Sequence, residues 1–373
     1  MRILPFLSAA TLASAQTPLW TAYTGWPTCY RQPLLVKTPT ALLAIVEGRP
    51  GISWCSGTDW PAAPDFPILV RSSPDFGESW GPTMNITRGN LDFLVTVYDP
   101  TSASVILLVQ QGDAGVVMTR STDDGATWTP AAPIAIDAPA GVYASLIPGV
   151  GHGLVISPKY CLDSSCGVTA GRIVVPFVAT KVGPVANDTA CGSCATALVL
   201  SDDGGASWRV GAVSEQNGSR EAALAQFDSG DYGVMKGVIY ANERNLGNAT
   251  GNRLHALSFD GGETFAQYGR DSLPDVITGN WTGVVAGVTR FDRPPAASTY
   301  FFTAPAAVGA RANLSAWVSS DRGASWALRE TVWSGPAAYS DAIQLNDTHV
   351  GVIFEAGVTE FAGGIQFSAI EAM

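Results

Sequence analysis

An octet with the pattern Ser-x-Asp-x-Gly-x-x-Trp recurs along this chain of 373 residues. Five copies are present, the fourth with Phe in place of Trp, at residues 73–80, 121–128, 201–208, 258–265 and 319–326. We expect Asp to accept hydrogen bonds from the turn backbone, Gly to adopt the positive φ of a tight turn, and the aromatic ring to pack inward. Because the copies start 48, 80, 57 and 61 residues apart, the octet predicts a β-hairpin in a repeated supersecondary unit.

The sequence between the octets is typical of an all-β protein. It contains 40 Gly and 24 Pro but only 14% charged residues, and no segment has a sustained apolar stripe of helical period. Short β-rich runs such as 41–46, 172–177 and 350–354 are separated by turn residues. A four-stranded blade needs roughly 40–60 residues, so the chain predicts a six-bladed β-propeller in which one blade lacks an octet.

The N-terminus resembles a secretory signal. Arg2 precedes an apolar stretch over residues 3–12, and Ala13-Ser14-Ala15 forms a small-residue cleavage site. We therefore expect residues 1–15 to be removed and residues 16–373 to form a single propeller domain. Seven Asn-x-Ser/Thr sequons agree with an exported glycoprotein. They are Asn85, Asn187, Asn217, Asn248, Asn280, Asn313 and Asn346.

Six cysteines agree with an oxidising compartment. Their spacing favours two local bridges and leaves one more distant pair. The expected pairs are Cys161–Cys166, Cys191–Cys194 and Cys29–Cys55. A Cys-x-x-Cys pair can also be redox-active or bind a metal, but no second pair accompanies it and the three His residues are scattered. We therefore expect no metal and no cofactor.

A net charge of -11 removes the basic surface that a nucleic-acid-binding protein needs. No run after the first fifteen residues is long and apolar enough to span a membrane. We therefore expect neither nucleic acid nor a membrane as a partner, and a monomer is favoured.

A set of motifs outside the octets resembles the sialidase family, in order along nearly the whole chain. Tyr30-Arg31-Gln32-Pro33 is similar to the family's [FY]-R-I-P, and residues 42–49, which end in Glu-Gly-Arg49, are similar to L-L-A-F-x-E-x-R. Glu221 begins a segment similar to E-C-Q-x-x-E, and Arg244 ends Tyr-Ala-Asn-Glu-Arg, which is close to L-N-A-R. The octets themselves resemble the Asp boxes of sialidases and related β-propellers.

Three further motifs complete the resemblance. Arg311 lies in Arg-Ala-Asn-Leu, where the family has R-x-N-L, and Ala338-Tyr339-Ser340-Asp341 matches A-Y-S-D. Glu355 follows Phe354 where the family has Y-E. The resemblance implies a propeller whose loops bring these residues together at one end of its axis.

The resemblance implies that Arg31, Arg244 and Arg311 bind the carboxylate of a sialic acid. A guanidinium group suits this role because its planar fork binds a carboxylate through two hydrogen bonds and stays charged. By the family pattern, Glu355 orients Arg31, and Arg49 lies toward O4 of the sugar.

The same pattern assigns the catalytic groups. A carboxylate nucleophile would be repelled by the carboxylate on the sugar's anomeric carbon, whereas a neutral tyrosine avoids this repulsion. Tyr339 is the expected nucleophile, Glu221 its base, and Asp59 the acid/base that protonates the leaving oxygen. Asp65 is a rival for the last role, because both lie in the loop before the first octet. A Cys29–Cys55 bridge would hold this loop beside Arg31.

The sequence thus predicts a secreted, retaining exo-α-sialidase that releases terminal sialic acids, Neu5Ac or Kdn, from glycoconjugates through a tyrosyl-glycoside intermediate. The layout resembles secreted fungal sialidases, some of which prefer Kdn, and residues 90–93 are a candidate lining for the pocket around C5. Three alternatives stay open: a trans-sialidase, a catalytically silent glycan-binding propeller, and a propeller glycosidase that acts on neutral polysaccharides.

Overall fold

The computed structural model describes most of the chain. The described residues are 15–25, 27–50, 55, 66–87, 91–112, 115–182, 193–216, 218–246, 251–275, 277–278, 281–294 and 297–372. The expected signal peptide therefore lies almost wholly outside them. Within these ranges the helical elements are short 3₁₀ turns, η3 (Pro158–Tyr160), η4 (Cys166–Val168), η5 (Ser229–Tyr232) and η6 (Phe361–Gly363). None of the described helical turns could cross a membrane.

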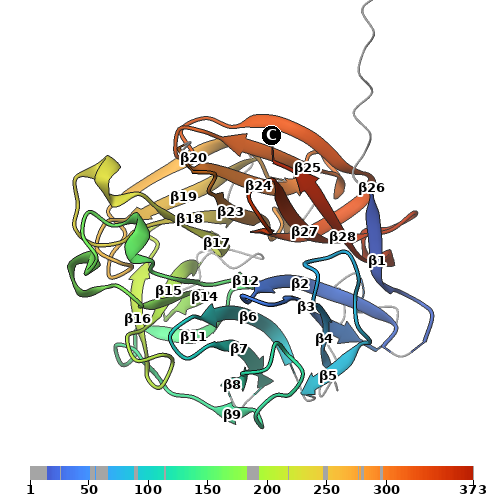
Figure 1. Ribbon diagram of the computed structural model, residues 1–373, viewed down its shortest axis with the longest axis horizontal. Coiled ribbons are helices and arrows are strands. Elements are labelled where there is room, and N and C mark those ends of the chain that lie inside the picture. The colour runs from blue at the N-terminus through green and yellow to red at the C-terminus, as the bar shows by residue number, and fades with distance from the viewer. Residues whose placement is uncertain are drawn as a thin grey trace, which may run out of the picture.

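Antiparallel sheets surround a central axis as six blades (Figure 1). Blade 1 consists of β2 (Cys29–Lys37), β3 (Leu42–Arg49), β4 (Ile68–Ser73) and β5 (Met84–Thr87). Blade 2 consists of β6 (Leu91–Asp99), β7 (Ser104–Gln111), β8 (Val116–Ser121) and β9 (Ala132–Pro133), with β12 (Gly151–His152) parallel to β6. Blade 3 consists of β11 (Tyr143–Pro148), β13 (Leu154–Val155), β14 (Ile173–Lys181), β15 (Cys194–Ser201), β16 (Trp208–Val213) and β10 (Ile136–Asp137).

The C-terminal half forms the other three blades. Blade 4 consists of β17 (Ser219–Phe227), β18 (Val238–Asn245), β19 (Asn252–Ser258) and β20 (Gln267–Pro274). Blade 5 consists of β23 (Gly287–Phe291), β24 (Thr299–Pro305), β25 (Ala312–Ser319) and the first part of β26 (Ala327–Gln344). Blade 6 consists of the rest of β26, β27 (His349–Ala356), β28 (Gly364–Glu371) and β1 (Gln16–Thr21). A separate two-stranded ribbon joins β21 (Ile277–Thr278) to β22 (Trp281–Thr282).

Two strands close the ring. The long strand β26 pairs with β25 along its first part and with β27 from Ala337 onward, so it belongs to blades 5 and 6. The N-terminal strand β1 pairs with the C-terminal strand β28, and Figure 1 shows the blue strand beside the red one. The prediction of a six-bladed propeller is confirmed.

The octets form the turns between the third and fourth strands of blades 1–5. In the first copy, Asp75 Oδ1 accepts hydrogen bonds from Ser79 N and Ser73 Oγ, both at 2.8 Å, while Gly77 adopts a φ of 111°. Hydrogen bonds from the side chain and backbone of Ser79 lower the pKa of Asp75 to about 2. The expected turn chemistry is present in every copy. Blade 6 lacks an octet because its fourth strand, β1, comes from the other end of the chain and needs no turn.

Among the described residues, bulges interrupt five innermost strands at the same end of the axis. The pairing register shifts after Arg31 in β2, Leu91 in β6, Tyr143 in β11, Arg220 in β17 and Ala337 in β26. Gln32 and Glu221, within two of these bulges, have positive φ angles of 56° and 47°. Because a bulge re-aims the side chains next to it, these positions can direct polar groups toward the axis.

The structure contains the Cys29–Cys55 and Cys161–Cys166 disulfides, whereas Cys191 lies outside the described residues. Three sequon asparagines, Asn85, Asn313 and Asn346, are exposed. The other four sequon asparagines also lie outside the described residues.

Candidate active site

The three predicted arginines meet around one tyrosine at the bulged end of the axis. Tyr339 lies at the bulge of β26, in blade 6. Its ring centroid is 5.1 Å from Cζ of Arg31 on β2, 5.8 Å from that of Arg244 on β18, and 5.6 Å from that of Arg311 in the loop before β25. Residues from blades 1, 4, 5 and 6, separated by up to 308 positions, therefore form a single site.

Glu355 fixes the first arginine and the tyrosine together. Its Oε1 accepts hydrogen bonds from Arg31 Nε at 2.6 Å and Gln32 N at 3.0 Å, and its Oε2 accepts one from Tyr339 N at 3.2 Å. Burial lowers the pKa of Arg31, but the charge of Glu355, the hydrogen bond to it and the nearby Tyr339 together raise it above its usual value. Arg31 Nη1 also donates to the carbonyl oxygen of Cys55, at 2.9 Å. The disulfide from Cys29 to Cys55 thus holds a direct partner of Arg31 in place.

Arg244 contacts both predicted members of the nucleophile–base pair. Its Nη1 donates to Tyr339 Oη at 3.0 Å and to Glu221 Oε2. Burial raises the pKa of Glu221, but the charges of the neighbouring arginines and the hydrogen bond from Arg244 together lower it below its usual value, so this carboxylate is ionised. Within the part of the chain that the structure describes, no direct hydrogen bond joins Glu221 to Tyr339. One Arg244 nitrogen contacts both groups and lies between them in the hydrogen-bond network.

Arg311 has a different environment. No described carboxylate lies within ion-pair distance of its guanidinium group. Burial lowers the pKa of Arg311, and the charges of Arg244 and Arg31 lower it further. A buried cation beside two like charges is stabilised by an added anion.

Arg49 lies beside this cluster on β3, held by Glu47. Its Nε and Nη2 donate to Glu47 Oε2 at 2.9 and 2.8 Å. The predicted acid/base Asp59 and its rival Asp65 lie outside the described residues, and so does Asn90. The assignment of the acid/base therefore stays a prediction.

Three residues that the motifs do not identify complete the site. The ring of Phe361 in η6 lies 5.1 Å from Cζ of Arg31 and 5.2 Å from that of Arg311. Asp275 accepts a hydrogen bond from Asn245 N, next to Arg244. Arg220 precedes Glu221, and its Cζ lies 5.8 Å from the Phe93 ring. Only Arg220 had a sequence signal, because it lies next to a predicted catalytic residue.

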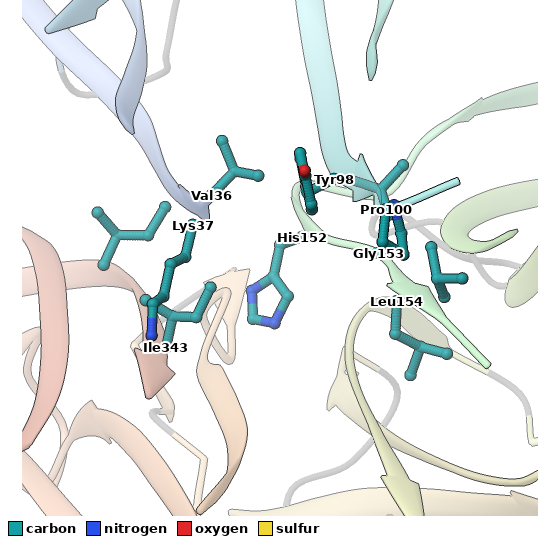
Figure 2. A pocket seen from close by; sticks show the side chains of 11 residues that line it. Val36, Lys37, Tyr98, Pro100, His152, Gly153, Leu154 and Ile343 are labelled. Atoms are coloured by element: carbon teal, nitrogen blue, oxygen red, sulfur yellow. The ribbon is translucent and has the colours of Figure 1, made fainter. Parts of the chain in front are cut away.

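A separate cavity of about 270 Å³ opens at the opposite end of the axis. Figure 2 shows Lys37 and His152 beside it, contributed by β2 and β12. His152 Nδ1 lies 2.7 Å from Asp341 Oδ1. Burial lowers the pKa of His152, but the charge of Asp341 and the hydrogen bond to it together raise it above its usual value. Asp341 Oδ2 also accepts a hydrogen bond from Leu35 N. This bond links β26 to β2 between the arginine cluster and the cavity.

Comparison with known proteins agrees with this geometry. The model of the BNR repeat-like domain family matches residues 162–352. The chain belongs to the BNR-repeat sialidase family. A sialidase of Micromonospora viridifaciens is 25% identical over 405 residues, and the match covers 95% of this chain and 57% of that protein. The chain thus spans a little over half the length of that relative.

Solved sialidase structures share the fold of the chain. The Hadza microbial sialidase Hz136 superposes with a TM-score of 0.71 at 17% identity, over 92% of this chain and 66% of that one. The intramolecular trans-sialidase from Ruminococcus gnavus superposes with a TM-score of 0.68 at 14% identity, over 92% of this chain and 94% of that one. The propeller therefore has the architecture of sialidase structures.

Proposed function

We propose that this protein is a retaining exo-α-sialidase that hydrolyses terminal sialic acids from glycoconjugates. One observation carries the proposal: Cζ of Arg31, Arg244 and Arg311 lies 5.1, 5.8 and 5.6 Å from the Tyr339 ring. A neutral sugar has no use for three buried guanidinium groups at one point, whereas a sugar with a carboxylate on its anomeric carbon needs both the cations and a nearby nucleophile.

The charge of the cluster matches a monoanionic substrate. Glu355 neutralises Arg31 and Glu221 neutralises Arg244, while Arg311 lacks a carboxylate partner among the described residues. The three arginines and these two carboxylates therefore carry about one net positive charge. The substrate carboxylate would supply the missing partner of Arg311 and place the anomeric carbon over Tyr339.

The first chemical step forms a bond between Tyr339 Oη and the anomeric carbon and breaks the bond from that carbon to the leaving oxygen. The phenol proton passes to Glu221, and the acid/base, which we assign to Asp59 with Asp65 as its rival, protonates the leaving oxygen. Arg244 Nη1, at 3.0 Å from Tyr339 Oη, stabilises negative charge that develops on the phenol oxygen.

The second step reverses the first with water. The acid/base removes a proton from a water molecule while the water oxygen attacks the anomeric carbon. The bond from that carbon to Tyr339 Oη breaks, and Glu221 returns its proton to the phenol oxygen. Two displacements at one carbon retain its configuration. Arg31 and Arg311 hold the carboxylate throughout.

Intramolecular transfer is a second candidate outcome, since the trans-sialidase from Ruminococcus gnavus shares this propeller. In that reaction a hydroxyl group of the bound sugar replaces water in the second step. Product analysis separates the two outcomes, because hydrolysis yields free sialic acid whereas intramolecular transfer yields an anhydro sugar. A catalytically silent propeller would bind sialic acid and release neither product.

We also propose that the protein is secreted after removal of residues 1–15, and that residues 16–373 form one catalytic domain. The Cys29–Cys55 and Cys161–Cys166 disulfides support an oxidising environment. Mass spectrometry of protein exported from its native host tests this through the mature N-terminus, which should be Gln16.

Turnover of fluorogenic α-glycosides of Neu5Ac and Kdn tests the proposed function. We expect hydrolysis of at least one, and a loss of at least about a thousandfold in kcat in Tyr339→Phe, which lacks the nucleophilic oxygen. Lys37→Met is the matched control, because Lys37 lies at the opposite end of the axis. Binding without turnover by the unaltered protein would contradict the proposal and support the silent propeller.

A further inference from the structure

We infer that Arg220 is a substrate-binding residue that donates a hydrogen bond to an oxygen on a substituent of the bound sugar. The inference rests on the proposed function and adds a specificity-determining contact to the same site. The shared chemistry of its ligand is an oxygen acceptor, either the carbonyl oxygen of an acyl group or a hydroxyl.

The backbone directs Arg220 into the site. Residues next to each other on a regular strand point to opposite faces of the sheet. The bulge of β17 begins directly after Arg220, and Glu221 has a positive φ of 47°. Arg220 Nη2 consequently lies 3.5 Å from Glu221 Oε1, so the two side chains lie on the same side of the strand.

The side chain bridges two blades. Its Cζ lies 5.8 Å from the centroid of Phe93, which β6 of blade 2 contributes, while Arg220 itself belongs to blade 4. Phe93 is only partly buried. The two side chains therefore form one surface, on which the phenyl ring of Phe93 is apolar and the guanidinium group of Arg220 offers hydrogen-bond donors. Such a surface suits a sugar substituent that carries an oxygen.

The donors of Arg220 are not satisfied by the protein. Arg220 Nε is buried and has no hydrogen-bond acceptor among the described residues. The nearest carboxylate, Glu221, also accepts a hydrogen bond from Arg244. A buried donor without a partner destabilises a fold by about 1–3 kcal/mol, and such groups concentrate at functional sites. The side chain as a whole is 14% exposed, so an acceptor on the substrate would reach the guanidinium group through its exposed part.

A purely electrostatic role of Arg220 toward Glu221 is the competing explanation for its place in the site. The charge of Arg220 is one cause, after that of Arg244, of the lowered pKa of Glu221. A residue with only that role needs a positive charge near Glu221 but not a particular donor geometry. Lysine retains the charge and removes both the Nε–H donor and the planar group beside Phe93. Arg220→Lys therefore separates the two roles, and Arg220→Gln removes both.

The experiment measures kcat, KM and the pH dependence of kcat/KM for fluorogenic glycosides of Neu5Ac and Kdn. We expect Arg220→Lys and Arg220→Gln each to raise KM by roughly 10- to 100-fold for the sugar whose oxygen Arg220 binds, with a much smaller change in kcat. A larger rise in KM for the Neu5Ac glycoside identifies the acyl oxygen as the acceptor for Arg220. A larger rise in KM for the Kdn glycoside identifies a hydroxyl oxygen as the acceptor. Arg209→Lys is the matched control, since Arg209 pairs with Asp202 and Glu263 in another part of the propeller.

Two results would overturn the inference. One is an unchanged KM in Arg220→Lys together with a shifted acidic limb of kcat/KM in Arg220→Gln, which would make Arg220 an electrostatic partner of Glu221. The other is unaltered kinetics in both variants, with circular dichroism showing that both are folded. If the unaltered protein turned over neither glycoside, the proposed function would fail. Calorimetric binding of free Neu5Ac and Kdn to the unaltered protein and to Arg220→Lys would then decide the role of Arg220, and equal affinities would refute it.

Discussion

At the scale of single residues, Glu355 organises the site more than any other carboxylate. One fully buried side chain accepts hydrogen bonds from Arg31 Nε, Gln32 N and Tyr339 N. It thereby fixes two groups at once: Arg31, the proposed substrate-binding cation, and the backbone of Tyr339, the proposed nucleophile. A replacement of Glu355 should therefore reduce both the stability of the fold and the activity.

Replacement of Glu355 by Gln tests this linkage. The change leaves Arg31 as a buried cation without its partner, so we expect the free energy of unfolding to fall by about 3–5 kcal/mol and most activity to be lost. Urea denaturation and sialoside hydrolysis measure the two effects. Glu371→Gln is the control, because Glu371 is exposed at the end of β28. A stable, fully active Glu355→Gln variant would refute the role assigned to Glu355.

We expect Glu243, next to Arg244, to make the free energy of unfolding depend on pH. It is buried, its Oε1 has no hydrogen-bond partner among the described residues, and burial raises its pKa to about 7. Between about pH 4.5 and pH 7 the folded protein retains a proton that the unfolded chain releases, so stability falls as the pH rises through this window.

We expect Glu243→Gln to reduce this pH dependence, because the amide resembles the protonated acid in shape and cannot ionise. As the pH rises from 4.5 to 8, the melting temperature of the variant should fall less steeply than that of the unaltered protein. Parallel curves would show that Glu243 does not titrate in this range.

At the scale of elements, the octets join blades as well as closing turns. A Cβ atom on Gly77 of blade 1 would lie 2.4 Å from Phe367 of blade 6, and one on Gly125 of blade 2 would lie 2.5 Å from Leu43 of blade 1. In both octets the glycine packs against the preceding blade. The motif therefore needs glycine for its positive φ and for the close approach of the neighbouring blade.

Gly77→Ala should consequently destabilise the protein more than a glycine replacement that affects only φ. Gly141 is the control, with a φ of 73° and no atom within 4 Å of an added Cβ. We expect a loss of about 1 kcal/mol for Gly141→Ala and of about 2–5 kcal/mol for Gly77→Ala, which adds a clash with a buried ring to the backbone strain. Equal losses in thermal or chemical unfolding would show that the octet does not need this contact.

The elements could be predicted from the sequence where a periodic signal exists. The octets predicted five hairpins because Asp, Gly and Trp recur at fixed spacing, and the ordered motifs predicted which arginines meet. The bulges at Gln32 and Glu221 could not be predicted, because these residues rarely adopt positive φ and nothing local requires it. Phe361 was also missed, because its contact with two arginines depends on the packing of η6 against other blades.

At the scale of the whole molecule, closure of the ring depends on β1. Trp20 on this strand is buried, lies 6.0 Å from the ring of Tyr30, and donates a hydrogen bond to Thr83 Oγ1 at 3.0 Å. Tyr30 precedes Arg31 on β2. The strand that completes blade 6 thus also packs against the strand that carries the first arginine of the site.

Trp20→Ala should therefore weaken both closure and activity. We expect the free energy of unfolding to fall by about 3–5 kcal/mol and KM to rise, because β2 loses a packing partner near Arg31. Val358→Ala is the control at an exposed position. If Trp20→Ala melted like the unaltered protein, β1 would not contribute to closure of the ring.

The central claim is that Tyr339 becomes covalently bonded to the sugar while the three arginines hold its carboxylate. The most direct measurement is peptide mass spectrometry after incubation with a 2,3-difluoro sialic acid, whose fluorine at C3 slows release of the intermediate. The account predicts one added fluorosialosyl group on the peptide that contains Tyr339, and none on Tyr339→Phe. A label on an Asp or Glu, or glycoside turnover with no covalent adduct at all, would contradict it.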